Sequence, residues 1–135
     1  MPLYMCNTKT GEIGEDAKSK ISEDITEIHC RITDAPPTFV HSFFFTQFPL
    51  IDLEDKTVVL VGNIRAGRTD EQKAQMIDEM HQSIHTHSGV ALEEIAVRTN
   101  DTPASWVMEG GDLLPEPGEE AEWLANHEAK LAEAE

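Results

Sequence analysis

Cysteine, basic residues and long apolar runs are scarce in this chain of 135 residues. The two cysteines are too few for a disulfide framework, which favours a reduced, cytoplasmic compartment. Ten Lys and Arg residues against 26 Asp and Glu residues give a net charge of −16, which argues against nucleic acid and anionic membrane surfaces as partners. No apolar run approaches the length of a membrane span, and the first residues lack the basic and apolar segments of a signal peptide.

One stretch of the chain predicts a strand, a tight turn and a helix in direct succession. The unbroken apolar run Val58–Val61 is typical of a strand that is covered on both faces. Gly67 ends the apolar pattern. Thr69 and, three residues later, Gln72 have the spacing of a capping box, which predicts a helix that starts there and runs to Gly89.

Two arginines, Arg65 and Arg68, lie at the junction between this strand and this helix. A guanidinium group is a planar fork that matches the two oxygens of a carboxylate, so the pair is a candidate clamp for an acidic substrate. The alternative is a pair of solvated turn arginines that bind Asp70 or Glu71. Spacing alone does not decide between the two interpretations.

The remaining pattern predicts two β-α-β units in one four-stranded sheet. Besides the strand that begins at Val58, we expect strands at Leu3–Asn7, Phe39–Phe45 and Ile95–Thr99, and a first helix from about Glu15. Each unit joins two parallel strands through a crossover helix. The predicted fold class is therefore α/β (α+β), with a mixed sheet and both helices on one face.

We predict a single domain with four parts. Residues 1–46 form the first β-α-β unit, 47–56 a linker, 57–100 the second unit, and 101–135 a C-terminal arm with an acidic tail. From Pro103 onward nine carboxylates face Lys130 alone, for a net charge of −8. The same region is rich in turns but also carries apolar residues, so it is a candidate for wrapping a neighbouring subunit.

Pro2 follows the initiator methionine and would carry a free secondary amine if Met1 is removed. A free α-amino group titrates at about 7.7–8.0 in model compounds, and burial or nearby arginines lower this pKa. Pro2 is therefore a candidate general base. The alternative is a stiff, inert terminus, and retention of Met1 would block the amine as an amide.

Three histidines are candidate site residues. His29 lies about 80° from the centre of the apolar stripe of the first helix, where a side chain reaches a cleft edge or is an ordinary boundary residue. His81 and His85 are four residues apart, which is also a metal-ligand spacing, but no Glu or Cys pattern completes a site. We predict no metal and no organic cofactor.

Four segments together resemble the tautomerase superfamily: MPLY at the start, ITEIH ending at His29, IRAGR ending at Arg68, and EGGDLLPEPGEEAEW from Glu109 to Trp123. The segment from Ile64 to Lys73 resembles the strand-to-helix turn of 4-oxalocrotonate tautomerase. The whole chain resembles the longer, fused members typified by cis-3-chloroacrylic acid dehalogenase. The resemblance implies a tautomerase fold and a homotrimer.

The resemblance also implies roles for five residues. Pro2 would be the catalytic amine, and His29 would help to hold the substrate. Arg65 and Arg68 match the two carboxylate-binding arginines of the dehalogenase. Glu109 matches the carboxylate that activates water there.

One position departs from the dehalogenase pattern, because Arg98 stands where that family has a tyrosine. In 4-oxalocrotonate tautomerase the equivalent strand carries an arginine that polarises the keto acid. A guanidinium stabilises an enolate better than a phenol does, and pairing with Arg98 would make Glu109 a weaker base. Trp106, an aromatic residue of the arm, completes the candidates as a substrate-binding side chain.

The predicted function is proton transfer, by keto-enol tautomerisation, on small 2-keto or enol carboxylic acids, with Pro2, Arg68, Arg98 and Glu109 as catalytic candidates. The first alternative is a cofactor-free hydratase or hydrolytic dehalogenase of 3-substituted acrylic acids such as cis-3-chloroacrylate. The alternative of another class is a catalytically inactive oligomeric binding protein with the same fold.

Overall fold

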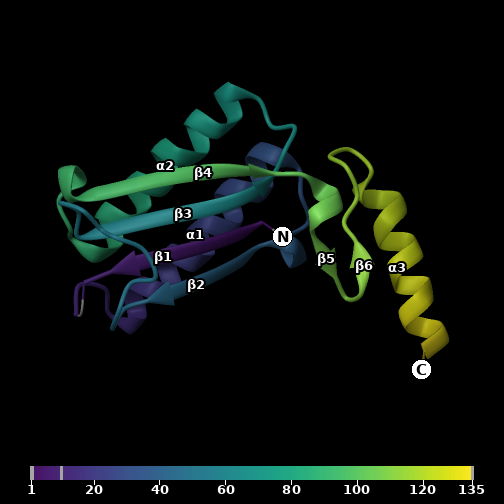
Figure 1. Ribbon diagram of the computed structural model, residues 1–135, viewed down its shortest axis with the longest axis horizontal. Helices are drawn as coiled ribbons and strands as arrows, with labels where there is room; N and C mark the ends of the chain where they lie inside the picture. Colours follow the sequence, from purple (N-terminus) through teal and green to yellow (C-terminus); the bar gives the residue numbers. More distant parts are fainter. Residues whose placement is uncertain (1, 10, 135) are drawn as a thin grey trace.

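The computed structural model describes residues 2–9 and 11–134 (Figure 1). The sheet-forming part contains β1 (Leu3–Thr8), α1 (Glu15–Thr33), β2 (His41–Phe45), β3 (Val58–Arg65), α2 (Asp70–Ser88) and β4 (Ile95–Thr102). The arm contains β5 (Met108–Glu109), β6 (Asp112–Leu113) and α3 (Glu120–Ala134). Single 3-10 turns are found at Pro37–Phe39, Leu92–Glu94 and Ala104–Trp106.

The four long strands form a mixed sheet in the order β2-β1-β3-β4. β1 is parallel to β2, β3 is parallel to β4, and the two units meet through the antiparallel pair β1 and β3. Both long helices cover the same face of the sheet, behind the strands in Figure 1. The predicted fold class, two β-α-β units in one mixed sheet, is confirmed.

The core lies between this sheet and the two helices. The predicted stripe of α1 is confirmed, because Ile21, Ile25 and Ile28 are buried while Ala17 and Ile32 pack against the core at its margin. The strands and α2 add buried side chains that alternate along the strands and recur at helical spacing in α2: Tyr4, Cys6, Val58, Leu60, Ile64, Met76, Met80 and Ile84.

The start and end of α2 follow the local signals in the sequence. The Thr69 side chain accepts a hydrogen bond from the Gln72 amide at 3.0 Å, and the Gln72 side chain accepts one from the Thr69 amide at 2.9 Å. The predicted capping box is therefore confirmed. At the other end Gly89 has a φ of 77° and its amide donates to the His85 carbonyl, as expected for a left-handed C-cap.

Three predicted strand bounds are wrong. β1 ends at Thr8 rather than at Asn7, because Thr8 still pairs with Val58 of β3. β2 begins at His41 rather than at Phe39, because Pro37–Phe39 forms a 3-10 turn that buries the Phe39 ring before the chain becomes extended. β4 continues beyond Thr99 to Thr102, because it pairs with β3 as far as the register Arg65 to Thr102. The hairpin of β5 and β6 and the helix α3 were not predicted.

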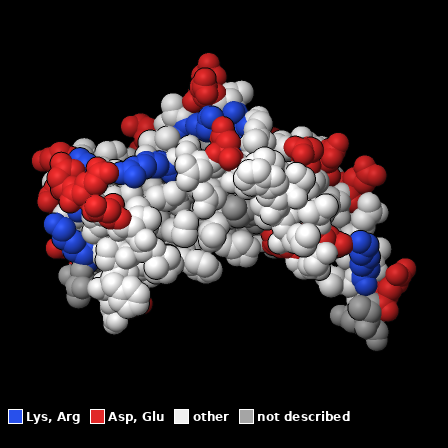
Figure 2. Space-filling model, in the orientation of Figure 1, with Lys and Arg blue, Asp and Glu red and all other residues white. Residues whose placement is uncertain are grey.

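The sheet face opposite the two helices carries a row of neighbouring side chains across all four strands. The strand register aligns Phe43, Met5, Val61 and Arg98 in this row. Figure 2 shows that the sheet side of the molecule is mostly uncharged, while acidic residues gather along its margins.

No helix within residues 2–9 and 11–134 is long and apolar enough to cross a membrane.

Candidate active site

The start of β1 and the end of β3 meet at one edge of the sheet. The antiparallel register of these strands, extended by one residue, places Pro2 beside Ile64 and next to Arg65. Pro2 is buried, and its carbonyl accepts a hydrogen bond from the His41 amide at 3.0 Å. Met1 lies outside the described residues. The register thus places the candidate base next to Arg65, one of the two arginines of the candidate clamp.

Arg65 is almost completely buried and is bound by the C-terminal arm. Its Nη1 donates to the Pro115 carbonyl and its Nη2 to Glu120 Oε1 at 2.8 Å, while the guanidinium lies 5.6 Å from the centre of the Phe39 ring. Burial raises the pKa of Glu120, but the hydrogen bonds from Arg65 and from the Gly118 amide outweigh it, so the pKa lies below its usual range. Arg65 therefore fastens the arm to the end of β3.

Arg68 has a different environment, although it is only three residues away. Its Nη1 donates to the Thr33 carbonyl at 3.1 Å, and its buried Nε has no hydrogen-bond partner among the described residues. Burial and then the charge of Arg65 lower the pKa of Arg68. The alternative interpretation paired the arginines with Asp70 or Glu71. In the structure Oδ1 of Asp70 lies 3.7 Å from Nζ of Lys73 instead.

His29 lies inside the protein rather than at the margin of the helix. It is 1% exposed, and its Nδ1 is 2.7 Å from the hydroxyl oxygen of the equally buried Tyr4. Burial, then the charges of Arg68 and Arg65, lower the pKa of His29 to about 3. The imidazole is therefore neutral at physiological pH, and it lies within the electrostatic range of both arginines.

Glu109 reaches the same edge of the sheet from β5. Its Oε1 is 3.6 Å from Nε2 of His41, the residue whose amide binds the Pro2 carbonyl. Glu109 is thus placed beside the start of β1. Trp106, in the 3-10 turn between β4 and β5, is 77% exposed.

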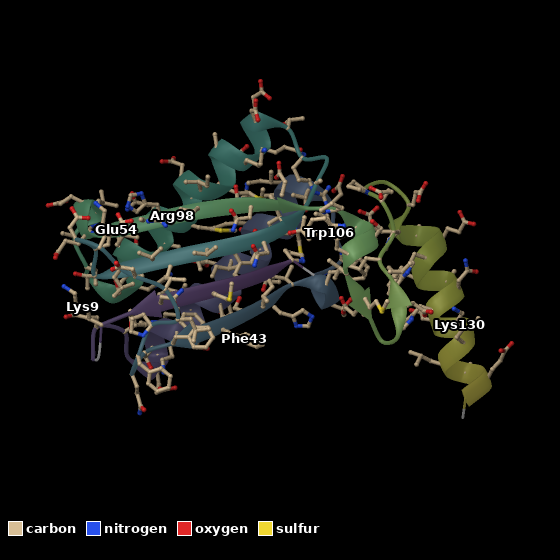
Figure 3. All side chains as sticks on the ribbon, viewed as in Figure 1. Lys9, Phe43, Glu54, Arg98, Trp106 and Lys130 are labelled. Carbon is tan, nitrogen blue, oxygen red and sulfur yellow. The ribbon has the colours of Figure 1, made fainter. Side chains whose placement is uncertain are left out.

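Arg98 does not join the other candidates within one chain. It is four residues before Thr102, the partner of Arg65, which corresponds to about 13 Å along the strand. Because Val97 packs against the core, Arg98 points to the opposite face of the sheet. Figure 3 shows Arg98 on one half of the molecule and Trp106 on the other. Within one chain the strand register therefore places Arg98 away from the end of β3 that carries Arg65.

The two histidines with metal-ligand spacing each contact a backbone carbonyl oxygen through a ring nitrogen. His81 Nε2 lies 2.7 Å from the Leu92 carbonyl and His85 Nδ1 lies 2.7 Å from the Val90 carbonyl. Within residues 2–9 and 11–134 no group of three or more His, Cys, Asp or Glu side chains is arranged to hold a metal ion.

Three residues of this region were not predicted from the sequence: Tyr4, His41 and Glu120. Tyr4 had a usable signal, because it occupies an alternating, inward-facing position of the predicted first strand. A buried tyrosine usually finds a hydrogen-bond partner for its hydroxyl. His41 and Glu120 act through contacts between distant segments, for which local sequence offers no comparable signal.

Comparisons with known proteins show the family of this chain. The model of the family described as tautomerase enzyme matches residues 63–114. A probable tautomerase of Bradyrhizobium diazoefficiens is 36% identical over 50 residues, which cover 37% of this chain and 75% of the relative. The chain belongs to the tautomerase superfamily.

Solved structures extend the similarity of this tautomerase-superfamily protein to the whole chain. A crystal structure of a member of the cis-3-chloroacrylic acid dehalogenase family matches with a TM-score of 0.85 and 28% identity, covering 98% of this chain and 97% of that chain. A fused 4-OT protein, described as a symmetric trimer, matches with a TM-score of 0.71 and 19% identity over 84% of this chain and 95% of that chain. The second match concerns the fold alone.

Proposed function

We propose that this tautomerase-superfamily protein catalyses keto-enol tautomerisation of small 2-keto or enol carboxylic acids with Pro2 as the general base. One observation supports the proposal: the strand register puts Pro2 beside Ile64 and next to Arg65, and the buried, neutral His29 lies within the electrostatic range of Arg65 and Arg68. After removal of Met1, this geometry gives the Pro2 amine a buried site with positive charges nearby. Both features favour the neutral amine, which is the form that accepts a proton.

Arg68 is the principal ligand for the substrate carboxylate in this mechanism. It makes one hydrogen bond within the described chain and keeps a buried, unpartnered Nε, whereas Arg65 is already bound to Glu120. Arg65 contributes mainly positive charge and orientation. Neutral Pro2 takes a proton from the carbon next to the keto group and returns it to the oxygen, or carries out the reverse, and the cationic surroundings stabilise the enolate between the two steps.

A homotrimer would complete this site with Arg98. The row formed by Phe43, Met5, Val61 and Arg98 faces away from both helices, and an apolar sheet face of this kind suits contact with another copy of the chain. The similar fused 4-OT protein is described as a trimer. Arg98 of a neighbouring subunit would then polarise the keto oxygen. The Arg98 side chain of the same subunit lies too far along β4 to do so.

A second candidate function is hydration or hydrolytic dehalogenation of 3-substituted acrylates. Its support is the place of Glu109, next to His41 and near Pro2, together with the similarity to a member of the cis-3-chloroacrylic acid dehalogenase family. In this chemistry Glu109 would activate water, and protonated Pro2 would donate a proton to carbon.

The test starts with the intact mass of the purified protein, which shows whether Pro2 is the first residue. Enol-to-keto conversion of phenylpyruvate and chloride release from cis-3-chloroacrylate are then measured for the parent protein and for Pro2→Ala. We expect the parent protein to convert phenylpyruvate faster than it releases chloride from cis-3-chloroacrylate. Pro2→Ala should lose the phenylpyruvate activity, whereas Leu3→Ala, at the neighbouring residue, should keep it. Undiminished turnover in Pro2→Ala would refute the mechanism, and retained Met1 without turnover would favour the binding protein.

A further inference from the structure

Tyr4 and His29 form a buried polar pair. The proposed mechanism gives the tyrosine of this pair no role. Each is 1% exposed, and their rings meet edge to face with centroids 5.7 Å apart and an angle of 74° between the planes. The Tyr4 hydroxyl oxygen and His29 Nδ1 are 2.7 Å apart. The second ring nitrogen, Nε2, is buried and has no hydrogen-bond partner within the described residues.

The neighbouring strand is shaped to hold the Tyr4 ring in this position. Gly62 of β3 pairs with Tyr4 across the sheet, and a Cβ atom at Gly62 would lie only 2.4 Å from Cε1 and 2.7 Å from Cδ1 of the tyrosine. A glycine inside a strand commonly marks such a close approach. The absence of a side chain at Gly62 therefore allows the ring to lie flat enough to reach His29.

The direction of the hydrogen bond follows from counting donors and acceptors. Burial raises the pKa of Tyr4 and lowers that of His29, so both groups are neutral at physiological pH. If the Tyr4 hydroxyl donates to Nδ1, only the Nε2 hydrogen lacks a partner. If Nδ1 donated instead, the Tyr4 hydrogen and the Nε2 lone pair would both be unpaired in the described chain. The first arrangement leaves fewer buried polar groups unsatisfied and is the favoured one.

We propose that Tyr4 is a positioning residue that fixes His29 as the tautomer with its proton on Nε2, so that His29 donates a hydrogen bond to a carboxylate or keto oxygen of the substrate. This inference rests on the proposed function for the identity of the acceptor. His29 is then a neutral donor rather than a base, and it takes no proton during the reaction. A neutral N–H held in a buried site binds developing negative charge without having to lose or gain a proton.

The first test is independent of catalysis. Protein labelled with ¹⁵N on histidine is examined by long-range ¹H–¹⁵N NMR between pH 6 and pH 8, with His29 assigned through His29→Ala. We expect a protonated Nε2 and an unprotonated, hydrogen-bonded Nδ1 throughout this range. Tyr4→Phe, which keeps the ring, should shift the Nδ1 resonance and increase the Nδ1-protonated tautomer. An imidazolium, or protonation of Nδ1 in the parent protein, would overturn the proposal.

The second test separates positioning from packing. Tyr4→Phe should lower kcat/KM for phenylpyruvate by about tenfold, as expected for a misaligned hydrogen bond, and should leave N-terminal processing and the oligomeric state unchanged. In a His29→Ala background the same change should lower kcat/KM by less than twofold, because Tyr4 acts through His29. An equal loss in both backgrounds would contradict this role. Pro2→Ala turnover tests the proposed function separately, since the NMR result does not depend on it.

Discussion

The two β-α-β units share one order of elements but differ in what they bury. Between β3 and α2 of the second unit, the largest buried side chains facing the helix are apolar, such as Ile64, Met80 and Ile84. The first unit buries Tyr4 and His29 between its strand and its helix. Buried polar groups lower stability unless they are paired, so a polar pair in only one of two similar interiors indicates a use for it.

The difference suggests that the units have separate tasks. The second unit has strong local signals, namely the capping box at Thr69 and the C-cap at Gly89, and its apolar interior stabilises the sheet. The first unit begins α1 after Gly14, without a side-chain cap, and carries the neutral His29. We therefore expect substitutions in the second interior to act on stability and substitutions in the first to act on activity.

The largest effect on stability is expected for Met80→Ala. Met80 is fully buried in the second interior, and removal of such a side chain costs about 2–5 kcal/mol of the free energy of unfolding. Urea unfolding measures the change, and kcat/KM per folded molecule should stay within twofold. Met108→Ala, at a residue 70% exposed, is the matched control. A large loss of activity without loss of stability would break the proposed separation of tasks.

Gly62→Ala should affect both properties, because Gly62 belongs to the second unit and touches the tyrosine of the first. The added methyl group displaces the Tyr4 ring, and overpacking of this kind costs about 1–3 kcal/mol. The displaced ring also loses its contact with His29, so kcat/KM should fall at least as much as in Tyr4→Phe. Gly14→Ala is the control, since a Cβ atom there meets nothing within 4 Å. An unchanged kcat/KM in Gly62→Ala would mean that the position of the Tyr4 ring does not affect catalysis.

The sequence predicted the elements whose causes are local. The apolar run at Val58–Val61 and the capping pair of Thr69 and Gln72 lie within a few residues of one another, so their pattern is visible without a fold. The helical stripe through Ile21 and Ile25 was predicted for the same reason. Helix α3 was missed although its Ala, Glu and Leu content favours a helix, because the preceding prolines and glycines suggested an arm without regular structure.

The candidate site was harder to predict because its contacts join distant segments. Arg65 and Glu120 are 55 residues apart, and Tyr4 and His29 are 25 apart. Neither pair follows from spacing or from helical periodicity, since tertiary packing alone brings them together. The resemblance to known tautomerases supplied candidate residues, but it gave no indication that the arm's own carboxylate binds Arg65.

Glu120→Gln tests the ion pair that Glu120 of the arm makes with Arg65 of the second unit. A hydrogen bond between charged groups contributes about 1.5–3 kcal/mol, and loss of the charge beside buried Arg65 should cost about this much at pH 7. The pKa of Glu120 is lower in the folded than in the unfolded protein, so the stabilisation is present above the ordinary value of 4.5 and is lost as the pH falls through the folded pKa. Urea unfolding of both proteins should therefore converge at acidic pH.

The control for this substitution is Glu119→Gln, at the adjacent, exposed residue. It removes the same charge but should change stability by less than about 0.5 kcal/mol, as is usual for surface substitutions. Hydrogen exchange should show faster opening of α3 in Glu120→Gln only. Equal effects of the two variants would indicate that the net charge of the arm, rather than the bond to Arg65, determines its docking.

The smallest effect is expected for Thr69→Ala, which removes the cap of α2. Loss of the hydrogen bond to the Gln72 amide should lower the free energy of unfolding by about 1 kcal/mol. Thr86→Ala, at an exposed position inside the same helix, should leave stability unchanged or raise it slightly, because alanine favours the helix. Since Thr69 directly follows Arg68, its loss also shows whether the scaffold of the second unit holds the arginine in place. A rise in KM for phenylpyruvate at constant kcat would mean that the two tasks meet at this turn.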